Sequence, residues 1–120
     1  MPQNHKTGRE GLENGYSRAN QIGALIGAER LSNSSNEFRW NGRIVVIKTG
    51  SSAVVTRAML NRVAAVVYGE KKDGDWILYK ITSQKFEVLS DQAQSKNHAE
   101  KYRRVHRTQI RKYGQKIPID

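Results

Sequence analysis

The sequence contains no cysteine and only two prolines among its 120 residues. Without cysteine, the chain forms neither disulfide frameworks nor thiolate zinc sites, and it has no thiol nucleophile. The longest apolar run, near Val63 to Tyr68, is far too short to cross a bilayer. No positively charged segment followed by an apolar run marks a signal peptide at the N-terminus. We therefore expect a cytoplasmic protein (or a nuclear one in a eukaryote) that has no membrane partner.

Acidic residues are also few. Asp and Glu total 11 against 21 Lys and Arg, which gives a formal net charge of +10 at pH 7. Such an excess attracts polyanions, and nucleic acid is the commonest polyanion inside cells. An anionic membrane surface fits less well, because the basic segment lacks a broad apolar face. The charge predicts a protein that binds a DNA or RNA backbone, and a homodimer is compatible with the sequence.

Three segments of different character divide the chain. Residues 1–15 are rich in glycine and poor in apolar side chains, which predicts a flexible N-terminal arm. Residues 16–90 predict a core domain, and residues 91–120 predict a linker followed by a basic helix and tail packed on that core. The fold class that we expect is α/β (α+β), with a central mixed β-sheet flanked by helices and a basic C-terminal helix beside it.

Local patterns place the elements of the core. Asn41-Gly42 lies between two β-prone runs, which is the strongest short signal for a hairpin. The second of these runs is apolar on both faces, as expected for a central strand. Glycines within the first helix would allow another element to approach it closely. The remaining expected elements are helices at Tyr16–Leu31, Ser52–Arg62 and Ser83–Leu89, and strands at Val63–Tyr68 and Trp76–Ile81.

Positive charge is concentrated in the last third of the chain. Residues 97–114 have a capping-box-like start and a terminal glycine, so we expect them to form a helix. Arg103, Arg107 and Arg111 are four residues apart and would lie along one edge of that helix. The alternative is a solvated face whose cations pair with acids elsewhere in the fold. Eight cations with one local acid, Glu100, favour contact with phosphates: Lys96, Lys101, Arg103, Arg104, Arg107, Arg111, Lys112 and Lys116.

The predicted hairpin places an acid and a lysine on one face. With a two-residue turn, Glu37 lies opposite Val46, and the alternation of side chains puts Lys48 on the same side. A lysine in this position stabilises a phosphate or orients water near an acid-bound metal. An ordinary cross-strand ion pair is the simpler interpretation of the same geometry.

The order of these elements resembles the PD-(D/E)XK nuclease superfamily, which includes restriction endonucleases and Holliday-junction resolvases. The resemblance covers roughly residues 17 to 89. It implies that Glu37 binds a metal, that Lys48 is the catalytic lysine, and that Glu29 is the acid carried by the first helix, with Mg²⁺ as the cofactor. The glutamate of the family's E-x-K motif falls at Val46, and a valine cannot ligate Mg²⁺.

Two versions of the function follow from this resemblance. One is a Mg²⁺-dependent DNA endonuclease, and the other is a degenerate relative that binds DNA without cutting it, which Val46 favours. The alternative is a non-enzymatic RNA-binding protein of a ribonucleoprotein complex. A third interpretation is an interaction module whose acidic partner is a protein.

Overall fold

The structure, a computed structural model, describes the backbone of residues 3–32, 35–90 and 102–119, with side chains from residue 15 onward. The described helices and strands, in chain order, are α1 (Gln3–Ile26), β1 (Glu29–Arg30), β2 (Glu37–Trp40), β3 (Arg43–Thr49), β4 (Ser52–Thr56), α2 (Arg57–Arg62), β5 (Ala65–Lys72), β6 (Asp75–Thr82), α3 (Ser83–Ser90), β7 (Tyr102–His106), α5 (Arg107–Tyr113) and β8 (Gln115–Ile117). None of the described helices is long and apolar enough to span a membrane.

Six strands form one mixed sheet in the order β1-β2-β3-β5-β6-β8. Strands β3 and β5 run parallel, and the other neighbours in this sheet run antiparallel. Strands β4 and β7 form a separate antiparallel pair. The chain is therefore an α+β protein with a mixed sheet flanked by helices, as its sequence predicts.

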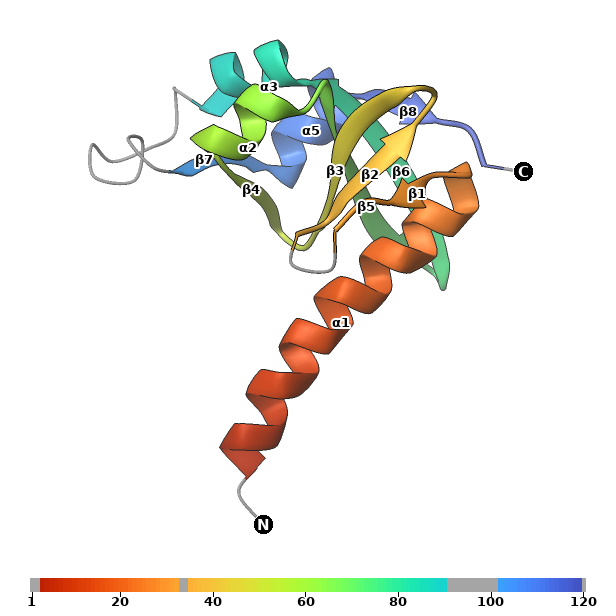
Figure 1. The fold of residues 1–120 in the computed structure, drawn as a ribbon, viewed down its shortest axis with the longest axis vertical. Coiled ribbons are helices and arrows are strands. Elements are labelled where there is room, and N and C mark those ends of the chain that lie inside the picture. Colours follow the sequence, from red (N-terminus) through yellow and green to blue (C-terminus); the bar gives the residue numbers. More distant parts are fainter. Residues whose placement is uncertain (1–2, 33–34, 91–101, 120) are drawn as a thin grey trace.

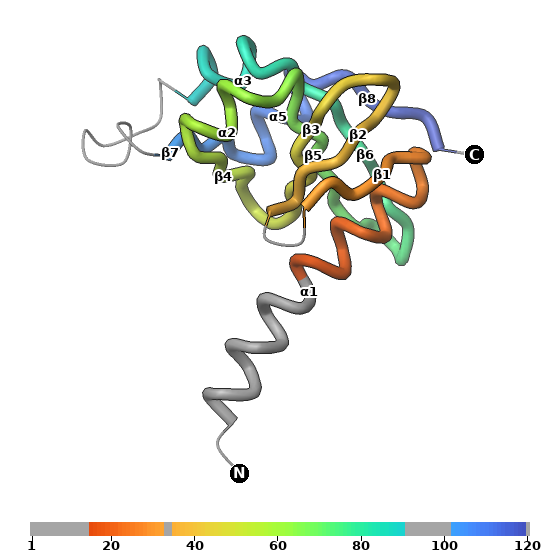
Figure 2. The backbone as a smooth tube through the Cα atoms, in the orientation of Figure 1, coloured from red at the N-terminus to blue at the C-terminus, as the bar shows by residue number. Residues whose placement is uncertain are grey.

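The two faces of the sheet are covered by different elements (Figures 1 and 2). Helix α1 covers one face, where its Ile22 packs against Phe38 and Val67. The opposite face is covered by α2, α3, α5 and the β4–β7 pair, whose apolar side chains surround Val46 and Tyr68. Strand β3 is thus buried on both sides, which explains its continuous apolar sequence.

The predicted hairpin is confirmed in detail. Asn41 (φ 52°) and Gly42 (φ 76°) both adopt the left-handed conformation that a two-residue turn requires. Strands β2 and β3 pair with Glu37 opposite Val46 and Trp40 opposite Arg43. The register expected from the turn is therefore the register observed.

Helix α1 approaches the sheet closely at a glycine. A Cβ atom on Gly23 would lie 2.5 Å from Cε2 of Phe38, so no side chain fits between this helix and β2. Gly27, with a φ of 73°, follows the end of the helix. The expectation that glycines here allow close packing is confirmed at Gly23.

Arg30 fastens α1 to the chain that follows it. Its Nε atom donates to the side-chain oxygen of Asn20 at 2.6 Å, and its Nη1 atom donates to the carbonyls of Ser32 and Ser35, both at 2.9 Å. The guanidinium also lies 3.9 Å from the centre of the Tyr16 ring. Arg30 therefore has a structural role, and the candidate functional cations lie elsewhere in the structure.

The prediction of a helix over Ser52–Arg62 is wrong for its first half and confirmed for its second half. Ser52–Thr56 forms β4, in which Ala53 and Val55 are buried and Val54 is exposed. The helix begins only at Arg57, because the hydroxyl of Thr56 accepts a hydrogen bond from the backbone N–H of Met59 and caps α2. The β-branched run before Thr56 favours a strand over a helix.

The prediction of a single C-terminal helix is also wrong. Residues 97–101 lie outside the described part of the chain, Tyr102–His106 forms β7, and only Arg107–Tyr113 is helical, as α5. In β7 the side chains of Arg103 and Val105 point inward. An arginine at an inward position hides the alternation of polar and apolar residues that would have identified a strand.

Most of the N-terminal segment predicted as an arm belongs to a helix. Helix α1 begins at Gln3, so the backbone of most of residues 1–15 is helical. The same helix ends at Ile26, and Glu29 consequently lies in β1 and not on the first helix. Strand β7 pairs with β4 and β8 pairs with β6, so the described C-terminal residues are built into the two sheets.

Candidate functional site

The three arginines predicted to form one helical edge have different surroundings. Arg103 is buried in β7, with its Nη2 atom 4.0 Å from a carboxylate oxygen of Glu87. Arg111 in α5 binds both carboxylate oxygens of Glu70, with Nε to Oε1 at 2.9 Å and Nη2 to Oε2 at 2.8 Å. Arg107 is exposed on α5. The prediction that these arginines lack acidic partners within the fold is wrong for Arg103 and Arg111.

The other predicted cations are dispersed. Arg104 is exposed on β7, Lys112 is exposed on α5, and Lys116 is exposed on β8 at the edge of the sheet. Lys96 and Lys101 lie outside the described residues. The described members of the predicted set are therefore spread over several elements, and two of them, Arg107 and Arg111 of α5, line one hollow of the molecule.

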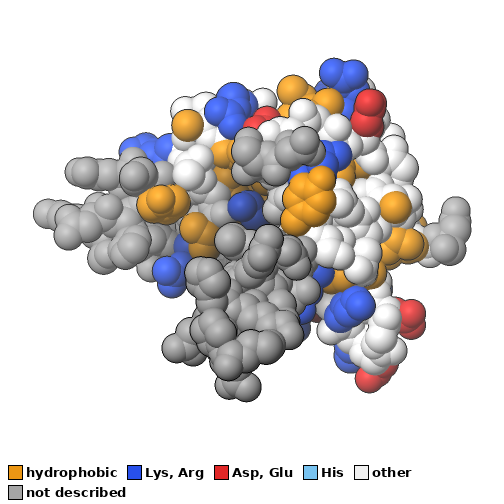
Figure 3. Space-filling model, turned by 60° about the horizontal axis from the view of Figure 1, so that its bottom comes forward, with side chains coloured by type: hydrophobic (Ala, Val, Ile, Leu, Met, Phe, Trp, Pro, Cys, Tyr) orange, Lys and Arg blue, Asp and Glu red, His pale blue; other side chains and the backbone are white. Residues whose placement is uncertain are grey.

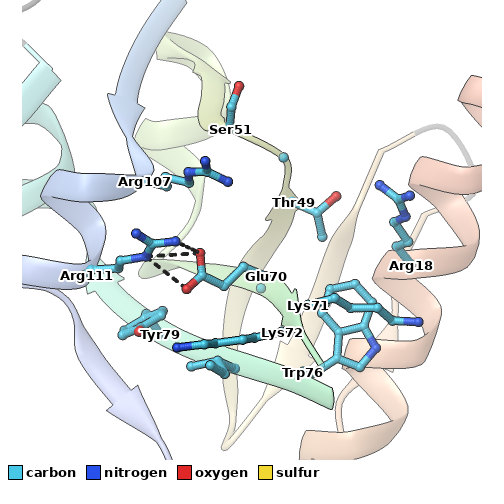
Figure 4. Close-up of a pocket in the computed structure, with 13 residues that line it drawn as sticks. Arg18, Thr49, Ser51, Glu70, Lys71, Lys72, Trp76, Tyr79, Arg107 and Arg111 are labelled. Carbon is cyan, nitrogen blue, oxygen red and sulfur yellow. Dashed lines mark hydrogen bonds and ion pairs between the residues drawn. The ribbon is translucent and has the colours of Figure 1, made fainter. Parts of the chain in front are cut away.

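A hollow of about 690 Å³ lies between α1, α5 and the ends of β3 and β5. Five cations from three elements line it, and we call it the cationic hollow: Arg18 from α1, Lys71 and Lys72 from β5, and Arg107 and Arg111 from α5. Figure 4 shows Arg107 and Arg111 extending from one side and Arg18 from the other. Among its lining residues, all of which the structure describes, Glu70 is the only acid.

The sheet topology explains why residues so far apart in sequence meet here. Strand β3 stops at Thr49, opposite Gly69, while β5 continues to Lys72 and so extends past its neighbour. Strand β7 runs antiparallel to β4, and this pairing places the N–H of Arg107 3.1 Å from the carbonyl oxygen of Ser51. Helix α5 therefore starts at the turn that ends β3, on the border of the hollow.

A buried tyrosine holds that turn in place. The hydroxyl of Tyr68 donates a hydrogen bond to the carbonyl oxygen of Gly50, whose φ of 108° marks the turn between β3 and β4. Burial, and then the nearby charge of Glu70, raise the pKa of Tyr68 above its ordinary value, while Arg107 and Arg111 oppose this shift. The phenol is therefore neutral at pH 7 and acts as a donor.

Glu70 orients Arg111 without covering it. Hydrogen bonding to Glu70 raises the pKa of Arg111, which is a permanent cation. The contact uses two of the five N–H groups of a guanidinium. Because the side chain of Arg111 is 45% exposed and that of Glu70 only 12%, the free edge of the guanidinium is accessible to an anion.

The predicted catalytic residues of the hairpin do not form a metal site. Glu37 accepts hydrogen bonds from Arg62 Nη2 at 3.0 Å and from Ser35 Oγ at 2.9 Å, so its neighbours are a cation and a hydroxyl. Lys48 is half-buried in β3, and burial lowers its pKa. Glu29 is exposed in β1, opposite Arg39.

The fit of Mg²⁺ to this site is poor. Val46, at the position of the second family acid, is fully buried and offers no oxygen. In the part of the chain that the structure describes, no three His, Cys, Asp or Glu side chains come close enough together to hold a metal ion. The residues present at the hairpin do not suit the metal that the resemblance implies.

The cationic hollow, by contrast, suits a phosphorylated ligand. Guanidinium groups bind two phosphate oxygens at once, and the hollow adds the hydroxyl-bearing residues Thr49 and Ser51. No family model, curated protein or solved structure matches this chain. The chemistry of the hollow therefore carries the functional conclusion.

Three cations of the hollow were not predicted as site residues: Arg18, Lys71 and Lys72. Lys71 and Lys72 fall between the predicted strands Val63–Tyr68 and Trp76–Ile81, but in the structure both lysines lie in β5 and only Asp73 and Gly74 form the turn. The Asp-Gly dipeptide between two predicted strands is a hairpin signal that could have placed these lysines on a strand. Arg18 carries no local signal, because only the tertiary structure brings α1 to this edge of the sheet.

Proposed function

We propose that this protein binds nucleic acid through the phosphodiester backbone, and that the cationic hollow is the binding site. The observation that carries this proposal is the convergence of five cations from α1, β5 and α5 on one concave surface with a single carboxylate. A cleft lined by one sign of charge concentrates counter-ions of the other sign. Lys and Arg side chains are spread over the face shown in Figure 3, and Asp and Glu are few there, which favours approach of a polyanion.

DNA is the polymer that the resemblance to the PD-(D/E)XK superfamily supports, and the mixed sheet flanked by helices fits that resemblance. The engagement of Glu37 by Arg62 and the apolar side chain of Val46 support binding without cleavage. We therefore propose a non-cleaving DNA-binding protein.

The test is binding of a fluorescent DNA oligomer, measured by anisotropy at several salt concentrations. Arg107→Ala and Lys72→Ala are each expected to weaken binding several-fold and to reduce the slope of log K against log salt by about 1. Arg43→Ala is the matched control, because Arg43 is exposed at the opposite end of β3. Equal affinity of the hollow variants and the wild-type protein would contradict the proposal.

The same assay separates the alternatives. Tighter binding to structured RNA than to DNA would select the ribonucleoprotein function. An affinity for DNA and RNA that does not respond to salt would favour a protein partner, since phosphate contacts release counter-ions. Cleavage of plasmid DNA with Mg²⁺, lost in Lys48→Ala, would show an active nuclease and overturn the non-cleaving proposal.

A further inference from the structure

The shape of the cationic hollow restricts the class of ligand further than the charge of the hollow does. Binding to a duplex backbone needs an exposed charged surface, because the phosphates lie on the outside of the helix. The hollow is instead a half-open concavity of about 690 Å³, a volume within the range of sites that bind small molecules. It has room for the sugar and base of a nucleotide as well as for its phosphate.

Aromatic and apolar side chains in the hollow provide a surface for a base. Trp76 of β6 lines it on the α1 side of the sheet, opposite Lys71 of β5, and Tyr79 of β6 lines it on the other side, opposite Tyr68. The indole Nε1 of Trp76 is 3.3 Å from the side-chain oxygen of Gln21 in α1 and donates a hydrogen bond to it, which fixes the plane of the ring. An oriented aromatic ring beside a cationic groove is typical of proteins that bind unpaired nucleotides.

Lys71 is placed to move between this ring and a phosphate. Its Nζ atom lies 5.2 Å from the centre of the Trp76 ring, where it makes a cation–π contact. An incoming base would take the place of the ammonium group on the indole, and the flexible lysine would turn to the phosphate of the same nucleotide. After this exchange the Trp76 ring would contact the base, and the ammonium group of Lys71 would contact the phosphate.

We propose that the hollow binds an unpaired nucleotide of a nucleic-acid strand, with its base stacked on Trp76 and its phosphate held on the same side of the sheet by Lys71 and Arg18. This inference rests on the proposed nucleic-acid binding and specifies the class of substrate as single-stranded. A duplex enters the hollow only where one of its nucleotides is unpaired.

The test compares three DNA probes in one anisotropy assay: an oligothymidylate, an abasic oligomer with the same number of phosphates, and a blunt duplex. The oligothymidylate is expected to bind about 5- to 100-fold tighter than the abasic oligomer, because stacking of a base contributes that much. Equal, salt-dependent binding of the two would overturn the inference and leave the proposed function standing. Salt-independent binding of every probe would overturn both. An oligouridylate that binds tighter than the oligothymidylate, with the same preference over its abasic form, supports the inference and identifies RNA as the source of the strand.

Tryptophan fluorescence gives a second readout. In Trp40→Phe, the remaining Trp76 emission is expected to be quenched by oligothymidylate and not by the abasic oligomer. Trp76→Phe is the matched control, because Trp40 is also a half-buried strand residue with a lysine over its ring, Lys80 at 5.8 Å, but lies outside the hollow. Emission of Trp76 that oligothymidylate leaves unchanged would overturn the inference, and the Trp40→Phe variant used for this readout has an unaltered hollow.

Discussion

Lys48 shows how its position in the fold changes the chemistry of a single side chain. It is half-buried in β3, beside Tyr68 of the parallel strand β5. Burial removes water from the ammonium group and lowers its pKa from the ordinary value of 10.5. Between the lowered pKa and 10.5, the unfolded chain binds more protons than the folded protein, so the free energy of unfolding rises with pH in that window.

Replacing Lys48 by methionine keeps most of the apolar stem and removes the charge. Lys48→Met is therefore expected to raise the free energy of unfolding at pH 7 and to flatten its rise toward pH 10, as measured by urea denaturation across this range. Lys116→Met is the control, because Lys116 is exposed in β8 and should change stability little. A loss of stability at pH 7 in Lys48→Met would show that the ammonium group is held by a favourable contact.

At the scale of single elements, the contact between α1 and the sheet depends on the absence of a side chain at Gly23. Replacing a helical glycine by alanine ordinarily stabilises a helix by about 1 kcal/mol. At Gly23 the new Cβ atom would lie 2.5 Å from the ring of Phe38, which is itself buried and cannot move freely. Gly23→Ala is expected to destabilise the protein by about 1–3 kcal/mol, because the helix must move away from the sheet.

Gly15 provides the matched substitution in the same helix. A Cβ atom there meets nothing within 4 Å, so Gly15→Ala is expected to leave stability unchanged or raise it by up to about 1 kcal/mol. The free energies of unfolding of Gly23→Ala and Gly15→Ala, measured by chemical denaturation, test both expectations. Similar effects of the two substitutions would show that α1 does not approach β2 as closely as described.

Elements with a strong local signal could be predicted from the sequence. The Asn41-Gly42 turn fixed the β2–β3 register, and the apolar runs of β5 and β6 identified both strands. Strand β4 carries only the short β-branched run before Thr56, and it pairs with β7, which is about 50 residues away in the sequence. In β7, arginine spacing typical of a helical edge outweighed a short alternation that Arg103 conceals.

The candidate site could be predicted only in part, for the same reason. Arg107 and Arg111 stand out in a basic segment, so composition is enough to propose them. The partner of Arg111 is Glu70, from β5, and sequence spacing contains no information on that contact. Arg18 joins the site only because α1 packs across the sheet toward the same edge.

At the scale of the whole molecule, a net charge of +10 does not translate into ten phosphate contacts. Arg30 and Arg103 serve the fold, and the cationic hollow presents five cations. For single-stranded DNA, each contact contributes about −0.7 to the slope of log K against log salt. We expect a slope of roughly −3 to −4, measured by titration between low and physiological salt. A slope near zero would exclude phosphate contacts, and a much steeper one would show that cations outside the hollow take part.

The β4–β7 pairing has a consequence for how the protein is made. A chain growing from its N-terminus completes most of the six-stranded sheet long before Arg107 and Arg111 are added. Until β7 joins β4, the wall of the hollow formed by α5 does not exist. The nascent polypeptide thus completes the cationic hollow late, after most of the sheet that carries its other walls.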